Sequence, residues 1–189
     1  MTPLAWLLIA IAVLLLVSLT VSRNRFVRQR ALVDESWGDI DVELSRRHDL
    51  IPNLVATVQG YAAHEREVLD TLVRAREDAT AHRDDRPGAR EGFEETVTRA
   101  LQSVLARVEA YPDLKASANF LDLQRQLTLT EDRIAAARRF YNGNVRSYNT
   151  RVETFPANLV AGLFGFKAKD FFELRDQVAE VAPRVDPAG

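Results

Sequence analysis

The chain contains no cysteine among its 189 residues. Disulfide bonds, thiolate metal sites and acylation of a lipoprotein-type cysteine are therefore excluded. Histidine is also scarce, with His48, His64 and His82 only. None of the three follows a glutamate by three positions, the spacing of di-iron helical bundles, and Val68 stands where a zinc-protease motif begun at His64-Glu65 would carry its second histidine. The sequence therefore predicts no metal site and no cofactor.

Signals of catalysis and of nucleic-acid binding are also missing. There is no glycine-rich phosphate loop, and no serine has a histidine at a spacing that suggests a nucleophile and its base. Asp39 and Glu43 lie on one helix face, but Glu43 precedes Arg47 by four residues, so an ion pair on that face explains them. The net charge of -2 argues against a general affinity for nucleic acid. We therefore expect a protein that is not an enzyme, has no catalytic residue and has no nucleic acid among its partners.

A long apolar run is present near the N-terminus. From Leu4 to Val21 the only polar side chains are those of Ser18 and Thr20. As a helix this run would rise about 27 Å, close to the roughly 30 Å of a bilayer hydrocarbon core. A cleaved signal peptide is the alternative, but it would have a basic N-terminal region and a shorter apolar run. The sequence predicts that residues 1–23 form a retained transmembrane anchor.

Positive charge follows the apolar run and does not precede it. The arginines are Arg23, Arg25, Arg28 and Arg30. Because cytoplasmic flanks of membrane spans carry an excess of basic residues, we expect the N-terminus outside and the C-terminal domain in the cytoplasm. The same four side chains are predicted to lie at the membrane interface and contact anionic headgroups, so membrane lipid is an expected partner.

Beyond the anchor, apolar residues recur with alternating spacings of three and four, which is typical of packed helices. The clearest frame contains Phe120, Leu123, Leu127, Thr130, Ile134, Ala137, Tyr141, Val145, Tyr148, Val152 and Phe155. Three more frames cover residues 26–61, 68–79 and 93–111, and turn-forming residues separate them, while Ser117 can cap the fourth helix. No strand pattern competes. The predicted fold class is all-α, with the transmembrane helix followed by an antiparallel four-helix up-and-down bundle at residues 24–154.

Polar residues crowd around Pro52 in the first frame. They are Arg46, Arg47, His48, Asp49 and Asn53, to which antiparallel pairing would add Glu131. The apolar spacing continues in phase through Pro52, which favours one kinked helix over two separate helices. Arg47 falls on a core position, and an ion pair with Glu131 or Asp132 there would fix helix register more than it would add stability. The alternative is a ligand or partner site at the kink.

An apolar, phenylalanine-rich segment follows the bundle at residues 155–176, starting near the expected bilayer surface. Its aromatic residues are Phe155, Phe164, Phe166, Phe171 and Phe172. The second and third predicted helices are shorter than the first and fourth, so the half of the bundle nearest the membrane would contain only two helices. One interpretation is that the segment folds back and covers these two helices. The other is that Phe164 and Phe166 lie in the membrane interface, with nearby lysines at the headgroups. Residues 177–189 are expected to form a disordered tail.

Six stretches of the chain resemble the LemA family in order and in spacing. They are Ile40–Leu44, Arg46–Val55, Gly60–Glu65, Tyr111–Lys115, Arg138–Asn142 and Phe155–Val160. What the resemblance implies is a small bacterial membrane protein with an N-out anchor and a four-helix bundle, and the expected location is the bacterial inner membrane. The resemblance supplies no catalytic residue, and some members of the family are linked to membrane organisation.

Two functions of different classes remain open. The favoured one is a scaffold or membrane-organisation factor that acts through self-association into a homo-oligomer, through the lipid surface or through unidentified protein partners. The other is a signalling or regulatory accessory that relays a state between the anchor and a cytoplasmic partner, with the polar residues around Pro52 as its bistable element. The first predicts stable homo-oligomers and lipid binding, and the second predicts a specific partner.

Overall fold

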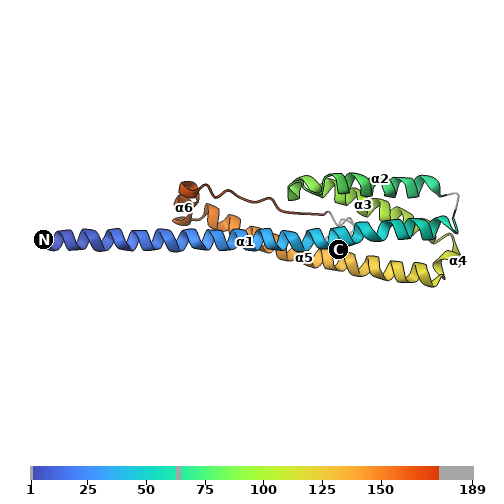
Figure 1. Ribbon diagram of the computed structural model, residues 1–189, viewed down its shortest axis with the longest axis horizontal. Helices are drawn as coiled ribbons and strands as arrows, with labels where there is room; N and C mark the ends of the chain where they lie inside the picture. Colours follow the sequence, from blue (N-terminus) through green and yellow to red (C-terminus); the bar gives the residue numbers. More distant parts are fainter. Residues whose placement is uncertain (1, 63–64, 175–189) are drawn as a thin grey trace, which may run out of the picture. The chain divides into compact units, whose positions relative to one another are not determined.

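Every regular element in the described part of the computed structural model is an α-helix, as the sequence predicted. The structure describes residues 2–62 and 65–174, so the tail expected at 177–189 lies outside the described residues. Figure 1 shows the helices in chain order. They are α1 (Pro3–Gln59), α2 (Arg66–Ala81), α3 (Pro87–Val108), α4 (Pro112–Lys115), α5 (Ala118–Glu153) and α6 (Ala157–Phe164).

Helix α1 is uninterrupted. Its first part is a candidate transmembrane helix, because among the described helices it alone is long and apolar enough to cross a bilayer, and none of that stretch is buried in the protein. Leu14 and Leu16 leave 69% and 65% of their surface uncovered, as lipid-facing side chains would. Further along, Pro52 lies inside the helix without ending it. The prediction of one continuous helix through Pro52 is confirmed.

Contacts divide the chain into two compact units. Unit 1 contains residues 1–50 and 124–171, and unit 2 contains residues 51–123 and 172–189. In unit 1, α1 and α5 lie side by side (Figure 1). Phe26 contacts Tyr148 and Arg47 contacts Glu131, so the two helices are antiparallel. The buried core of this unit includes Phe26, Val33, Ile40, Leu44, Leu127, Ile134, Tyr141, Val145 and Tyr148.

In unit 2, α2 and α3 form an antiparallel pair. His82 stacks on Phe93 at one end, with ring centroids 3.8 Å apart. At the other end the Tyr111 hydroxyl donates a hydrogen bond to Glu65 Oε1 at 2.9 Å. The buried core of this unit includes Ile51, Leu54, Leu69, Leu72, Val97, Leu101, Val104, Leu114 and Phe120.

The turns of unit 2 follow the expected residue chemistry. Pro87 is the first residue of α3, where a helix needs no backbone donor. The Phe120 N–H donates to Ser117 Oγ at 3.2 Å at the start of α5, so the predicted cap is confirmed. Between these points the structure adds the short helix α4, which the sequence analysis did not anticipate.

The apolar frames predicted core positions for Val68 in α2 and for Phe93 in α3, and both residues are only half-buried. In α2 the neighbouring Leu69 is fully buried in place of Val68. In α3, Arg90 and Glu94 are both buried and lie 3.5 Å apart, next to a half-buried Phe93. An ion pair at positions i and i+4 neutralises both charges, which allows them to occupy positions that a search for apolar residues passes over.

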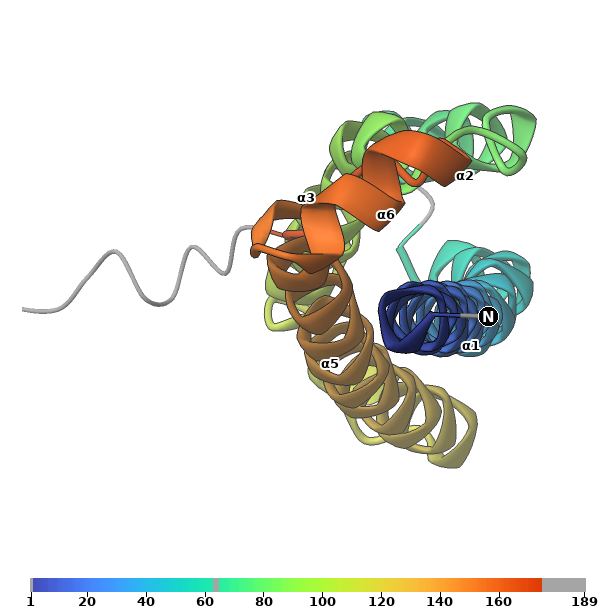
Figure 2. The ribbon, with the colours of Figure 1, turned by 90° about the vertical axis from the view of Figure 1, so that its left-hand side faces the viewer.

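The apolar segment predicted at 155–176 does not form one element. Its first part is α6, and Figure 2 shows α6 turned away from the axis of α5. Gly165 ends α6 with a φ of 70°, a left-handed conformation that favours glycine, and the Phe166 N–H donates back to the Ala161 carbonyl at 2.9 Å. Described residues after Gly165 are not helical. The segment is therefore divided at Gly165 into two parts with different surroundings.

Candidate functional site

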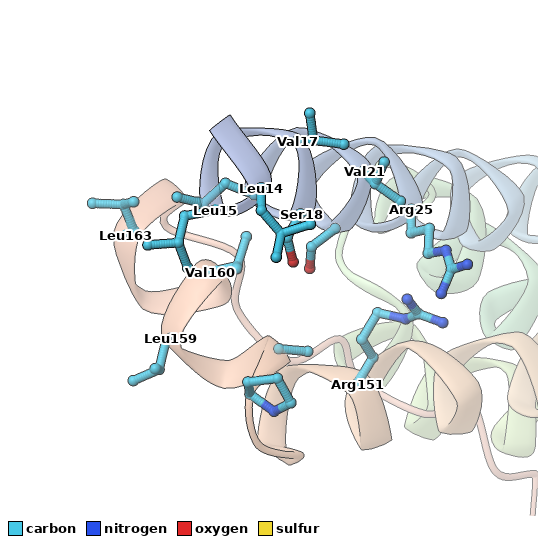
Figure 3. Close-up of a pocket in the computed structure, with 14 residues that line it drawn as sticks. Leu14, Leu15, Val17, Ser18, Val21, Arg25, Arg151, Leu159, Val160 and Leu163 are labelled. Carbon is cyan, nitrogen blue, oxygen red and sulfur yellow. The ribbon is translucent and has the colours of Figure 1, made fainter. Parts of the chain in front are cut away.

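Helix α6 lies beside the candidate transmembrane part of α1. A groove of about 630 Å³ lies between the two helices (Figure 3). On one side it is lined by residues of α1 from Leu14 to Arg25, and on the other by Arg151 and by residues from Pro156 to Leu163. The start of this segment was expected near the bilayer surface, and from there α6 runs beside Leu14–Val21, within the apolar run of α1.

The large exposed side chains of α6 are apolar, although Asn158 is also exposed. Leu159, Leu163 and Phe164, together with Phe155 just before the helix, expose between 45% and 74% of their surface. The Asn158 N–H donates to the Thr154 carbonyl at 2.9 Å, so the turn into α6 satisfies this donor internally, and the exit is closed by the bond at Gly165 described above. Internal satisfaction of backbone groups is what a hydrocarbon environment demands, since no water is available there. Helix α6 is therefore suited to lipid contact.

The predicted interfacial arginines follow directly after the apolar run. Arg23 places its guanidinium 5.5 Å from the ring centroid of Phe164, a cation–π arrangement. Arg30 pairs with Asp34 at 3.8 Å on the surface. Arg25 lines the groove together with Arg151, which was not among the predicted site residues.

Residues 166–171, which we call the seam segment, pack along α1 and α5 in unit 1. Phe166 stacks on Phe26 with ring centroids 4.8 Å apart. The side chain of Asn149 donates to the Lys169 carbonyl at 2.9 Å and accepts from the Lys169 N–H at 2.8 Å. Phe166 was grouped with Phe164 at the membrane interface, but its ring packs against Phe26, because Gly165 turns the chain between the two. The fold-back interpretation therefore describes residues 166–171, whereas contact of α6 with the membrane stays a prediction.

Tyr141 binds the residue that follows Lys169 in the seam segment. Its hydroxyl donates a hydrogen bond to the Asp170 carbonyl at 2.8 Å. Burial raises the pKa of Tyr141 to about 12, and the nearby charges of Asp170 and Asp34 act in the same direction. The phenol therefore remains protonated at neutral pH and keeps its donor for the seam segment.

The polar residues around Pro52 do not form one site. Arg47 is fully buried and donates to Glu131 Oε1 at 3.0 Å, so the structure brings these two together. His48 is also buried. In contrast, Arg46 is exposed and pairs with Glu43 on its own helix at 3.2 Å.

Asp49 and Asn53 face solvent, and Asn53 belongs to unit 2. A small pocket of about 230 Å³ in unit 2 includes Pro52 and is lined by apolar residues together with Gln59 and Arg76. A ligand site next to Pro52 stays a prediction. Within residues 2–62 and 65–174, no cluster of three or more histidine or acidic side chains could hold a metal ion.

Sequence comparisons relate the chain to known proteins. The sequence model of the LemA family matches residues 36–186, starting after the candidate transmembrane part of α1. The chain is 26% identical over 198 residues to the magnetosome protein MamQ of Magnetospirillum gryphiswaldense, covering 88% of this chain and 71% of that protein. It is 26% identical over 139 residues to protein LemA of Metamycoplasma hominis, covering 74% of this chain and 63% of that protein.

A third relative is magnetosome protein MamQ 2 of Paramagnetospirillum magneticum, 25% identical over 184 residues, covering 82% of this chain and 66% of that protein. The chain thus spans about two thirds of the length of these relatives. Since the family match covers most of its residues, the chain belongs to the LemA family.

Proposed function

We propose that this protein is a non-enzymatic scaffold that organises the bacterial inner membrane through self-association and lipid contact. In this proposal α1 crosses the membrane once, with the N-terminus outside. The helices α1, α2, α3 and α5 form an antiparallel up-and-down bundle in the cytoplasm, and the bundle is the part that meets other copies of the chain.

The observation that carries the proposal is the position of α6. It lies beside the part of α1 nearest to the arginines, from Leu14 to Val21, and its large exposed side chains are apolar. With α1 spanning the bilayer, α6 would widen the protein in the cytoplasmic leaflet alone. A helix that inserts into one leaflet makes binding sensitive to membrane curvature. Many copies held together would therefore favour a membrane patch of defined shape.

The relatives give independent support. Two of those described above are named as magnetosome proteins, and each aligns with more than four fifths of this chain. A role in shaping or organising membrane fits those names and needs no catalytic site.

Reconstitution into phosphatidylcholine vesicles tests the proposal. We expect the wild-type chain to crosslink to itself and to change vesicle size as seen by cryo-electron microscopy. The double variant Leu159→Ser/Leu163→Ser should remain membrane-bound through α1 and lose the effect on vesicle size. Leu121→Ser/Leu129→Ser is the matched control, because these α5 leucines are also exposed but lie on a different element. A chain that stays monomeric and leaves vesicles unchanged contradicts the proposal.

One observation favours the relay as a second candidate. Helix α1 continues without a break from the apolar run to Gln59, and the buried Arg47 bonds to α5 within unit 1. A displacement of the anchor could therefore be transmitted along a single helix. Crosslinking in intact cells separates the two functions, since the relay predicts one stoichiometric heterologous partner where the scaffold predicts multimers of this chain.

A further inference from the structure

Two arginines face each other at one end of the groove between α1 and α6. Figure 3 shows the guanidinium groups of Arg25, from α1, and Arg151, from the last turn of α5, pointing toward one another. Within residues 2–62 and 65–174, no carboxylate forms an ion pair with either of them, and the Nε of Arg151 is buried without a hydrogen-bond partner. Two cations that converge in this way repel each other unless an anion lies between them.

The rest of the groove is mostly apolar. Its walls include Leu14, Leu15, Val21, Val160 and Leu163 (Figure 3), and Ser18 and Ser22 add two hydroxyl groups. A volume of about 630 Å³ is within the range of sites that hold small ligands. A ligand that fits must therefore be long and apolar over most of its length and negatively charged at one end.

The position of the groove along the chain defines the ligand further. Its apolar walls belong to the part of α1 that is long and apolar enough to span a bilayer, and the arginines follow where that run ends. If α1 spans the bilayer, Arg25 and Arg151 lie at the depth of the lipid phosphates and the leucines lie at the depth of the acyl chains. Arginine is well suited to phosphate, because its planar fork can donate two parallel hydrogen bonds.

We infer that the groove binds one anionic phospholipid, with its phosphate between Arg25 and Arg151 and an acyl chain along Leu15, Val160 and Leu163. The site differs from the general attraction of the basic residues to a charged surface, because it depends on two converging side chains from different helices. It deepens the proposed function by naming the lipid class that this membrane-embedded part would select. It rests on the membrane insertion of α1 and α6.

Binding to the full-length, delipidated protein in neutral detergent tests the inference. Phosphatidylglycerol, phosphatidylcholine and inorganic phosphate are added separately, and binding is measured by native mass spectrometry and by the shift in melting temperature. We expect phosphatidylglycerol to bind wild-type protein best. Arg25→Gln/Arg151→Gln should weaken it by about tenfold or more, since charge-assisted hydrogen bonds are lost.

The matched control is Arg28→Gln/Arg146→Gln, which removes the same charge from the same two helices at exposed positions outside the groove. Because Arg28 is expected to attract anionic headgroups only in a general way, this control should lose far less phosphatidylglycerol binding than Arg25→Gln/Arg151→Gln. Val160→Trp keeps both arginines and fills the groove, so it should also weaken binding, and it serves as the second variant if the double arginine variant does not fold.

Three results would overturn the inference. Equal losses in the double variant and its control would mean that only surface charge matters. Equal binding of phosphatidylcholine would remove the selectivity for anionic lipid, and equal binding of inorganic phosphate would show an anion site without a lipid. None of these results affects vesicle remodelling by Leu159 and Leu163 in phosphatidylcholine, so the proposed function is tested separately.

Discussion

Arg47 is among the largest side chains that this protein buries completely, and its partner Glu131 leaves 40% of its side chain exposed. The sequence predicted the buried position and limited the partner to Glu131 or Asp132, because Arg47 interrupts an apolar frame and the antiparallel register brings it level with α5. What the sequence could not give is the exposure of Glu131. A carboxylate open to water is well solvated even when its partner is removed, so the pair adds less than a fully buried one. Arg47 therefore contributes to the stability of the fold mainly through the space that its side chain fills.

The loss of stability on substituting Arg47 should therefore depend more on the size of the new side chain than on its charge. Arg47→Ala leaves a cavity and should lower the free energy of unfolding by about 3 kcal/mol. Arg47→Met fills most of that space and should cost less than about 1.5 kcal/mol. Arg46→Ala is the control on the same helix, where loss of an exposed pair should cost about 0.5 kcal/mol or less. Denaturant unfolding of the detergent-solubilised chain measures all three, and equal losses for Ala and Met at Arg47 would show that charge dominates.

At the scale of elements, helical periodicity located α1, α2, α3 and α5, because spacing reports which face of a helix is buried. It does not report what buries that face. Tyr141 and Asn149 are covered by the seam segment through bonds to the main-chain atoms of Asp170 and Lys169. Main-chain atoms are the same in every residue, so these contacts leave no pattern in the side chains of the seam segment. The one available signal was Gly165, since a glycine after an apolar helical stretch often ends a helix.

The division at Gly165 predicts different roles for two phenylalanines that are close in sequence. Phe166→Ser removes the ring that stacks on Phe26 and should destabilise unit 1 by about 2 kcal/mol, less than for a fully buried phenylalanine because Phe166 is half-buried. Phe164→Ser alters an exposed ring and should leave the melting temperature nearly unchanged. Thermal unfolding of the full chain in detergent compares the two. If Phe164→Ser were the more destabilising change, the assignment of residues 166–171 to the seam segment would be wrong.

At the scale of the whole molecule, the absence of cysteine allows a direct test of membrane orientation. Thr2 and Asp39 are both exposed and lie on opposite sides of the apolar run. With the N-terminus outside, a membrane-impermeant maleimide should label Thr2→Cys in intact cells and should label Asp39→Cys only after lysis. Wild-type protein gives the background, since it has no thiol to react. The opposite labelling pattern would reverse the predicted orientation.

The two units also differ in how their residues are distributed along the chain. Most of unit 2 comes from the continuous stretch 51–123, whereas unit 1 joins residues 1–50 to residues 124–171. Contacts between distant parts of a chain form more slowly than local ones, and folding during synthesis begins with the residues made first. Unit 2 can therefore begin to fold while α5 is still being translated. Unit 1 must wait until the seam segment has left the ribosome, so for much of its synthesis α1 lacks the partners that later cover Phe26 and Ile40.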